Sequence, residues 1–191
     1  MLVSFTGAQS TGKSTLLNMC MDHLLKQAND WTFVPEVTRL IRRTHGVSIN
    51  EQGDDDTQLL IMNQHLLNTI NYKSDGSNNH MMDRCVVDGY VYSKYLHNHG
   101  RLTDNTWRIV ECMYEHLLPE LHCIFYTHPE DIPIEDDGER SVNQDFRNEI
   151  IDIYDSLELS TMNSWVILKG DPHQRMDQIL SHLQPELYLQ T

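Results

Sequence analysis

The sequence has few cysteines and lacks a long apolar run. Its four cysteines, spread over 191 residues, form no C-x-x-C pair, which argues against a disulfide framework and a structural zinc site. No apolar stretch approaches the roughly 20 residues that a membrane-spanning helix needs. We therefore expect a cytoplasmic protein with no membrane partner.

Basic residues are scarce as well. The chain has 14 Lys and Arg against 28 Asp and Glu, which gives a net charge of −14. Nucleic-acid-binding proteins usually neutralise phosphates with a basic stripe, and the sequence shows none. The balance favours a small soluble substrate, while a local cluster of Arg39, Arg42 and Arg43 leaves a polymeric substrate open.

Residues 7–14 read GAQSTGKS, a full match to the phosphate-binding pattern G-x-x-x-x-G-K-[ST]. An apolar run of strand character precedes this P-loop and a helical stretch follows it. Glycines let successive N–H groups converge on an anion at the positive end of the helix dipole. We expect the loop to bind ATP, with Lys13 reaching the β- and γ-phosphates and Ser14 ligating Mg²⁺. The nucleotide-binding residues are then Gly7, Ala8, Gln9, Ser10, Thr11, Gly12, Lys13, Ser14 and Thr15.

Short apolar runs alternate with longer helical stretches along the chain. Strands are expected at 2–6, 31–34, 80–82, 123–127 and 165–168, and helices at 13–28, 36–43, 55–73, 87–97, 105–118, 144–159 and 174–183. This alternation predicts an α/β fold: a single three-layer α/β/α domain over residues 1–191, with a parallel sheet of about five strands. Ligands of such folds bind beyond the carboxyl ends of the strands.

The longest expected helix, 55–73, carries an apolar face with one polar member. The face comprises Leu59, Leu60, Asn63, Leu66, Leu67 and Ile70. Its helical spacing predicts that this face packs on the core. Asp104 is expected to cap the helix that begins at residue 105.

Charged residues follow the second and third expected strands. Glu36 follows the second strand and is a candidate general base that accepts a hydroxyl proton, with Arg39 one turn further on the same side. Asp83 follows the third strand and is expected to hold Mg²⁺ or accept a hydrogen bond from Ser14. Arg84 is expected to bind a substrate phosphate or hydroxyl. The alternatives are that Glu36 only complements a helix N-terminus and that the Asp83–Arg84 pair is a surface ion pair.

The next helix starts with Asp88, Tyr90 and Tyr92, which are candidates for the wall of an acceptor pocket. Helix-start aspartates and core tyrosines are also ordinary structural features. Residues 169–175, after the last strand, are expected near the nucleotide base. No residue there identifies a base, and the segment contains no N-K-x-D pattern for guanine, so ATP is the default nucleotide and the choice between ATP and GTP stays open.

The segment of about 129–147 contains glycine and prolines, is acidic, and leads into a helix. It fits a lid that closes over the nucleotide and excludes water, as a kinase requires. Arg140 and Arg147 are expected to meet the transferring phosphoryl group. A plain surface loop is the alternative.

Together these motifs resemble the small P-loop nucleoside and nucleotide kinases. The likeness is strongest to the ribosylnicotinamide kinase domains of bacterial NAD-biosynthesis regulators and to a related ATPase-like family common in phages. The matching segments are TGAQSTGKST at 6–15, PEVTR at 35–39, DR at 83–84 and IEDDGERS at 134–141. The resemblance implies a P-loop kinase fold with ATP and Mg²⁺ as cofactors, in the host cytoplasm if the source is viral. Deoxynucleoside kinases carry Glu-Arg-Ser, and thymidylate kinases Asp-Arg-Tyr, where this chain has Asp83-Arg84-Cys85.

Three hypotheses remain. The first is an ATP-dependent kinase whose acceptor is a nucleoside, a nucleotide or nicotinamide riboside. The second has the same chemistry, but its acceptor is a hydroxymethylated pyrimidine base (5-hydroxymethyluracil) within phage DNA, with the three arginines of the local cluster and Arg84 along the DNA. The third is a P-loop NTPase switch without a kinase acceptor. The expected partners are thus a nucleotide donor and a small-molecule acceptor, or DNA, and a homodimer is left open.

Overall fold

The computed structural model describes residues 1–26, 31–76, 79–129, 143–157 and 164–183. The described strands form one parallel sheet in the order β2-β3-β1-β4-β5. The strands are β1 (Leu2–Thr6), β2 (Trp31–Val34), β3 (Asn79–Asp83), β4 (Cys123–Thr127) and β5 (Ser164–Leu168). Each expected strand is present, and two of them extend beyond the expected bounds.

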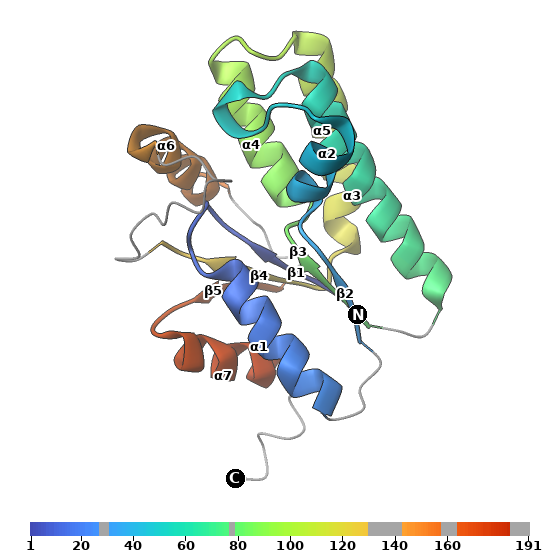
Figure 1. Cartoon of the computed structure of the whole chain (residues 1–191), viewed down its shortest axis with the longest axis vertical. Coiled ribbons are helices and arrows are strands. Elements are labelled where there is room, and N and C mark those ends of the chain that lie inside the picture. The colour runs from blue at the N-terminus through green and yellow to red at the C-terminus, as the bar shows by residue number, and fades with distance from the viewer. Residues whose placement is uncertain (27–30, 77–78, 130–142, 158–163, 184–191) are drawn as a thin grey trace.

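Helices cover both faces of this sheet. They are α1 (Lys13–Lys26), α2 (Val37–His45), α3 (Asp55–Asp75), α4 (Val86–Asn98), α5 (Asp104–Leu117), α6 (Gln144–Asp155) and α7 (Pro172–Leu183), with short 3₁₀ turns η1 (Asn50–Gln52) and η2 (Leu118–Glu120). In Figure 1, α1 and α7 lie on one face, and α3 to α6 lie on the other. The three-layer α/β/α fold predicted from the sequence is therefore confirmed.

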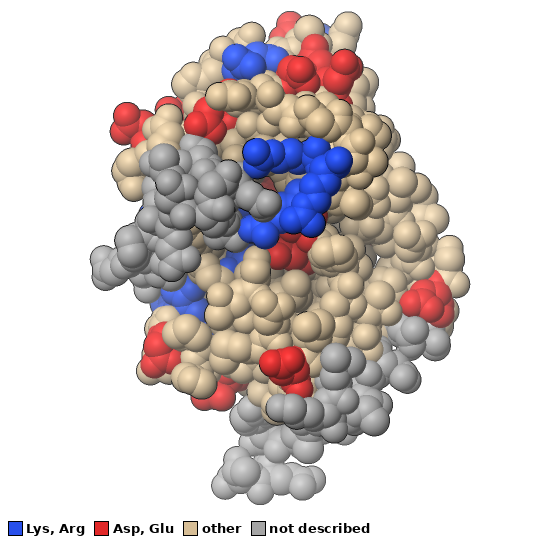
Figure 2. All heavy atoms as spheres, viewed as in Figure 1, with Lys and Arg blue, Asp and Glu red and all other residues tan. Residues whose placement is uncertain are grey.

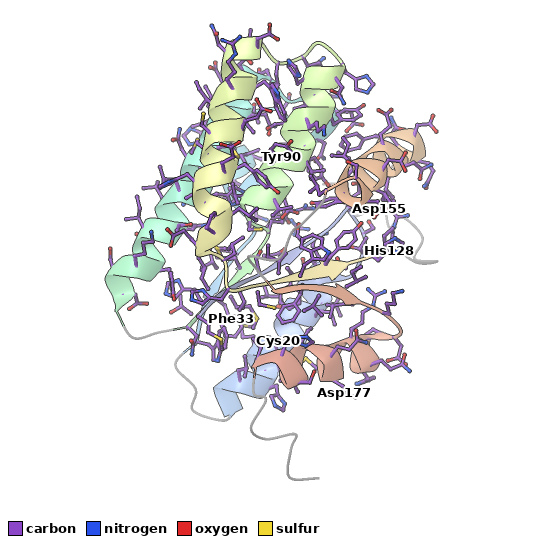
Figure 3. All side chains as sticks on the ribbon, turned by 180° about the vertical axis from the view of Figure 1, so that it is seen from behind. Cys20, Phe33, Tyr90, His128, Asp155 and Asp177 are labelled. Carbon is purple, nitrogen blue, oxygen red and sulfur yellow. The ribbon has the colours of Figure 1, made fainter. Side chains whose placement is uncertain are left out.

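Each side of the sheet has its own apolar core. On the α1 and α7 side, Phe5 and Phe125 pack with ring centroids 5.4 Å apart, next to the buried Cys20 of α1. Figure 3 shows Cys20 and Phe33 on this side. The Sγ atom of Cys20 lies 3.5 Å from the Sδ atom of Met176 on α7. Burying one large apolar side chain stabilises the fold by about 1.5–3 kcal/mol. The buried side chains on each face of the sheet therefore hold the helices of that face against it.

The central position of β1 places the P-loop between β3 and β4. Phe5 is in register with Asp83 on one side, and Thr6 is in register with Tyr126 on the other. All strands are parallel, so the residues that follow β1, β3 and β4 meet at one edge. The P-loop, Asp83 and Arg84 lie at this edge.

Helix α3 buries a different face from the predicted one. Leu67 is 50% exposed and Ile70 is 46% exposed, whereas the polar Gln58 and His65 are buried. The prediction of an apolar core-facing stripe is therefore wrong for this helix. Polar residues point inward because α3 passes over the carboxyl edge of the sheet, where the candidate site lies.

Two helix caps come from side chains that lie just before the helix. Thr103, rather than Asp104, caps α5, since its hydroxyl accepts from the N–H of Thr106 at 3.3 Å. Asn143 caps α6 by accepting from the N–H groups of Asp145 and Phe146. None of the helices in the described ranges is both long and apolar enough to cross a membrane.

Candidate active site

The P-loop curls through backbone conformations that favour glycine. The φ angles of Gly7 and Gly12 are 140° and 84°. A Cβ atom on Gly7 would lie 2.7 Å from Thr127 Oγ1 and 2.8 Å from Thr127 O, at the end of β4. Thr127 Oγ1 is also 2.6 Å from Thr11 Oγ1. The loop is thus held tightly against the end of β4.

Lys13 lies inside the curl of the loop. Its Nζ donates to the carbonyl oxygens of Gly7 and Ala8, at 2.9 and 2.5 Å, and to Thr11 Oγ1 at 3.2 Å. Burial, together with the nearby Arg84, lowers the pKa of Lys13 to about 7. The ammonium is therefore placed where phosphate oxygens would stabilise its charge.

Ser14 and Asp83 lie together beside the loop. The Ser14 hydroxyl donates to Asp83 Oδ2 at 2.9 Å, while Asp83 Oδ1 is buried and has no hydrogen-bond partner among the described residues. Burial raises the pKa of Asp83, and the nearby Glu36 raises it further. Mg²⁺ binds oxygen ligands, typically one or two protein groups plus phosphates. The hydroxyl and the half-satisfied carboxylate fit that requirement.

Arg84 connects the loop with two carboxylates. Its Nε donates to Glu36 Oε1 at 2.8 Å, and its Nη1 donates to Asp88 Oδ1 at 2.7 Å and to Gly7 O at 3.3 Å. The guanidinium also lies 5.4 Å from the ring centroid of Tyr92. The backbone of Arg84 has φ 75°, in the left-handed region. A strained turn thus aims a buried cation at the phosphate site.

Asp88 is engaged by four donors. Its oxygens accept from the hydroxyls of Thr6 and Tyr154, each at 2.8 Å, and from the N–H of Cys85 at 3.0 Å, in addition to Arg84. The bond to Cys85 closes a capping box at the start of α4. Asp88 therefore orders this corner of the site, as the alternative structural interpretation expected.

Arg84 and the residues around it line a pocket, which we call the Arg84 pocket. Five of the six residues predicted to contact the acceptor line it: Glu36, Arg39, Arg84, Asp88 and Tyr92. The sixth, Tyr90, is not among the described lining residues, and its ring stacks on that of Tyr114 instead. Residues that the sequence analysis did not assign to an acceptor complete the lining: Gln9, Thr38, Ile49, Asn50, Gln58, Ile61, His65 and Gly89. Within it, Arg39 Nε lies 2.9 Å from Glu36 Oε2. The residues after β2 and β3 are thus gathered around one space.

The predicted lid arginines are placed unequally. Arg140 and most of segment 129–147 lie outside the described residues. Arg147 is buried on α6, and burial lowers the pKa of its guanidinium. The preceding residue, Phe146, packs edge-on against Tyr92 with ring centroids 5.9 Å apart. Arg147 is not among the described residues that line the Arg84 pocket.

A second pocket lies on the other side of the P-loop, and we call it the Arg175 pocket. It is lined by Thr11, Gly12, Thr15, Leu16, Gly170, Asp171, Pro172 and Arg175. The Arg175 guanidinium donates to the carbonyl oxygens of Gly170 at 2.8 Å, Thr11 at 3.2 Å and His128 at 3.4 Å. Residues 169–175 were expected near the nucleotide base, and the structure places 170–172 and 175 beside the loop.

Thr127, His65 and Arg175 were missed as individual site residues. Thr127 ends β4, so the rule that ligands bind at strand ends could have identified it. His65 has no comparable signal, because it lies in the middle of a helix. Arg175 joins three loops that are distant in sequence, and such contacts leave no local pattern.

A protein-family model described as an AAA domain matches residues 2–175. No curated protein matches the chain significantly. The matched range includes the P-loop, Glu36, Asp83, Arg84 and the Arg175 pocket. The chain therefore belongs to the AAA domain family, with a P-loop fold of the nucleotide-binding and nucleotide-hydrolysing type.

Proposed function

We propose that the protein is an ATP-dependent kinase that transfers the γ-phosphoryl group to a nucleoside, a nucleotide or nicotinamide riboside. The observation that carries the proposal is the contact of Arg84 with both Gly7 of the P-loop and Glu36 of the Arg84 pocket. An acceptor in this pocket would lie next to the bound phosphates. Hydrolysis alone does not require a second polar pocket at that position.

The proposed reaction is an in-line transfer. The acceptor hydroxyl oxygen bonds to the γ-phosphorus, its proton passes to Glu36, and the bond to the β-phosphate oxygen breaks to release ADP. Burial raises the pKa of Glu36, but Arg84 and Lys13 outweigh this effect and hold it below the usual value. Glu36 is thus ionised at neutral pH and can accept the proton. Lys13 and Arg84 stabilise the charge on the phosphoryl oxygens, and Mg²⁺ held by Ser14 and Asp83 would neutralise phosphate charge.

The arrangement also supports the resemblance to small P-loop kinases. A carboxylate after β2 and an Asp-Arg pair after β3 occupy the positions that the resemblance implies for base, metal ligand and phosphate contact. The capping role of Asp88 does not conflict with this, since its bond to Arg84 orients the guanidinium.

Phosphate transfer can be tested with γ-labelled ATP, Mg²⁺ and a panel of acceptors. The panel contains nucleosides, nucleoside monophosphates, nicotinamide riboside and DNA with 5-hydroxymethyluracil. We expect label in one of the small acceptors. Label found only in free phosphate would contradict the proposal and favour an NTPase switch.

The role of Glu36 is tested by Glu36→Gln, which keeps the shape of the side chain but cannot accept a proton. Turnover should fall by about 10²–10⁴-fold, the usual contribution of a general base, with ATP affinity little changed. Glu115→Gln on the exposed surface of α5 is the matched control. Unchanged turnover in Glu36→Gln would remove Glu36 as the base.

A base within DNA is the second candidate acceptor, and helix α2 favours it. Arg42 and Arg43 are exposed on this helix, and Arg39 lines the Arg84 pocket. Figure 2 shows a band of Lys and Arg side chains around a hollow on the face where Figure 1 places α2. Arg42→Glu should weaken DNA binding and reduce its salt dependence by about one unit of slope, while Arg108→Glu on α5 should not. DNA binding that is insensitive to Arg42→Glu would argue against this acceptor.

A further inference from the structure

The charged side chains that line the Arg84 pocket are equal in number for each sign. Two carboxylates, Glu36 and Asp88, face two guanidinium groups, Arg84 and Arg39. Glu36 is ion-paired to both arginines, and Asp88 accepts from Arg84, two hydroxyls and a backbone N–H. Neither carboxylate therefore offers an unengaged negative charge to a ligand.

Two buried polar side chains in this pocket have atoms without partners. Gln9 is 4% exposed, and its Oε1 accepts from the Tyr92 hydroxyl at 3.2 Å, but its Nε2 has no hydrogen-bond partner in the part of the chain that the structure describes. His65 is 3% exposed, and its Nδ1 has no hydrogen-bond partner among those residues either. A buried polar atom left unpaired costs free energy, so such atoms point to a group that binds there.

The surroundings of these atoms favour an uncharged and flat ligand. Burial lowers the pKa of His65 to about 4, so its ring is neutral at physiological pH. Ile61 and the ring of Tyr92 add apolar surface to the lining. A Cβ on Gly89 would lie 2.5 Å from Met62 Sδ and 3.4 Å from His65 Cδ2, so α3 and α4 approach closely there. The inward-facing polar side of α3 thus borders a confined space.

We propose that the acceptor carries an uncharged planar heterocycle of the nucleobase kind, whose edge hydrogen-bonds to Gln9 Nε2 and His65 Nδ1. This inference rests on the proposed function, which places the acceptor in the Arg84 pocket. It selects neutral nucleosides or nucleotides over the cationic pyridinium ring of nicotinamide riboside. Among the described residues that line the pocket, a cationic ring would meet no unengaged carboxylate, and it would lose its hydration.

Binding to the wild-type protein tests the charge requirement. Kd values would be measured calorimetrically, with a non-hydrolysable ATP analogue present, for neutral nucleosides, nicotinamide riboside and its reduced, uncharged form. We expect at least one neutral nucleoside to bind about 10-fold or more tightly than nicotinamide riboside, a difference of about 1.4 kcal/mol. The reduced form should bind more tightly than the oxidised form. Tightest binding by the cationic riboside, or no nucleoside binding, would overturn the inference.

Substitutions at His65 test whether this side chain hydrogen-bonds to the heterocycle. His65→Leu removes the polar atom while keeping apolar bulk, and should weaken nucleoside binding by about 10–100-fold, the usual cost of an unpaired buried group. His65→Asn retains a polar atom near the position of Nδ1 and should recover most of this loss. ATP affinity should be unchanged in both. Equal nucleoside affinity in wild type and His65→Leu would refute the assignment.

Additional measurements distinguish a failure of this inference from a failure of the proposed function. If His65→Leu does not fold, as judged by its thermal transition, Gln9→Met tests the other proposed contact, with nucleoside affinity compared at saturating ATP analogue because Gln9 belongs to the P-loop. A short oligonucleotide with the preferred base distinguishes a polymeric from a free source of the heterocycle. Nucleoside binding that depends on His65, without any label transfer, would refute the proposed function alone. Label transfer that is independent of both residues would refute this inference alone.

Discussion

Glu36 and Arg84 form a 2.8 Å ion pair that joins the start of α2 to the turn after β3. The two residues are 48 positions apart in sequence. They meet because β2 and β3 are neighbours in which Val34 is in register with Met82, and each charged residue follows two positions later. The pair lies between the P-loop and the Arg84 pocket and forms the wall that they share.

Asp88→Asn should destabilise the protein by about 3–5 kcal/mol, since a buried ion pair would lose one charge. The amide would also present N–H donors to groups that now donate to Asp88. Urea unfolding measures the change, with the exposed Asp104→Asn as a control. A loss below about 1 kcal/mol would show that the four donors of Asp88 can find other partners.

Gly7→Ala should destabilise the protein more than Gly46→Ala. Both glycines have positive φ, so both substitutions strain the backbone, but only the Gly7 Cβ would collide with Thr127. The collision should add about 1–3 kcal/mol, the usual cost of overpacking. Denaturant unfolding of the two variants checks this difference. Equal losses would mean that the end of β4 can move away from the loop without cost.

His65 should make stability depend on pH in the acid range. Burial lowers its pKa to about 4 in the folded protein, from the ordinary value of 6.5. Between these values the unfolded chain binds the proton more readily, so the free energy of unfolding should decrease as pH falls from 6.5 towards 4. The loss from this group approaches about 3 kcal/mol, at 1.36 kcal/mol for each pKa unit.

The control for this pH dependence is His65→Leu, measured over the same range. Because leucine has no proton to bind, the variant should lose stability less steeply than the wild type between pH 6.5 and 4. Parallel curves for the two proteins would show that other groups cause the acid sensitivity.

Arg175→Lys should weaken ATP binding by about 10-fold. A lysine ammonium cannot direct three donors to Gly170, Thr11 and His128, so the P-loop and the start of α7 would no longer be held together. Loss of one such charged hydrogen bond costs about 1.5–3 kcal/mol. Calorimetric titration with ATP measures the effect, and Arg108→Lys on the exposed face of α5 is the control. Unchanged affinity would separate the Arg175 pocket from nucleotide binding.

The sheet and the positions of Glu36, Asp83 and Arg84 could be predicted because local signals coincide with tertiary placement. The apolar runs at 2–6, 31–34 and 123–127 match β1, β2 and β4. The predicted strand at 80–82 extends in the structure to Asn79–Asp83. There His80 is buried through contacts from outside the strand, with Asp75 at 2.8 Å and the ring of Tyr72.

The inner face of α3 could not be predicted from hydrophobic periodicity. Periodicity assumes that the buried face is apolar, whereas α3 buries Gln58 and His65 at a pocket and exposes Leu67 and Ile70. The Arg175 contacts depend on how three loops meet in space. Both features belong to the site, where local patterns and global structure commonly disagree.

The contact between Cys20 and Met176 has a consequence for chemical damage. Met176 directly follows Arg175 on α7. The same turn of this helix therefore contributes to the apolar core between α1 and α7 and also to the hydrogen bonds that Arg175 makes with the P-loop. Peroxide that reached Met176 during a local opening would convert its thioether to a polar sulfoxide, which no longer fits against α1. Oxidation behind the sheet would then displace Arg175 and disable the nucleotide side of the site, without modifying any residue that contacts substrate.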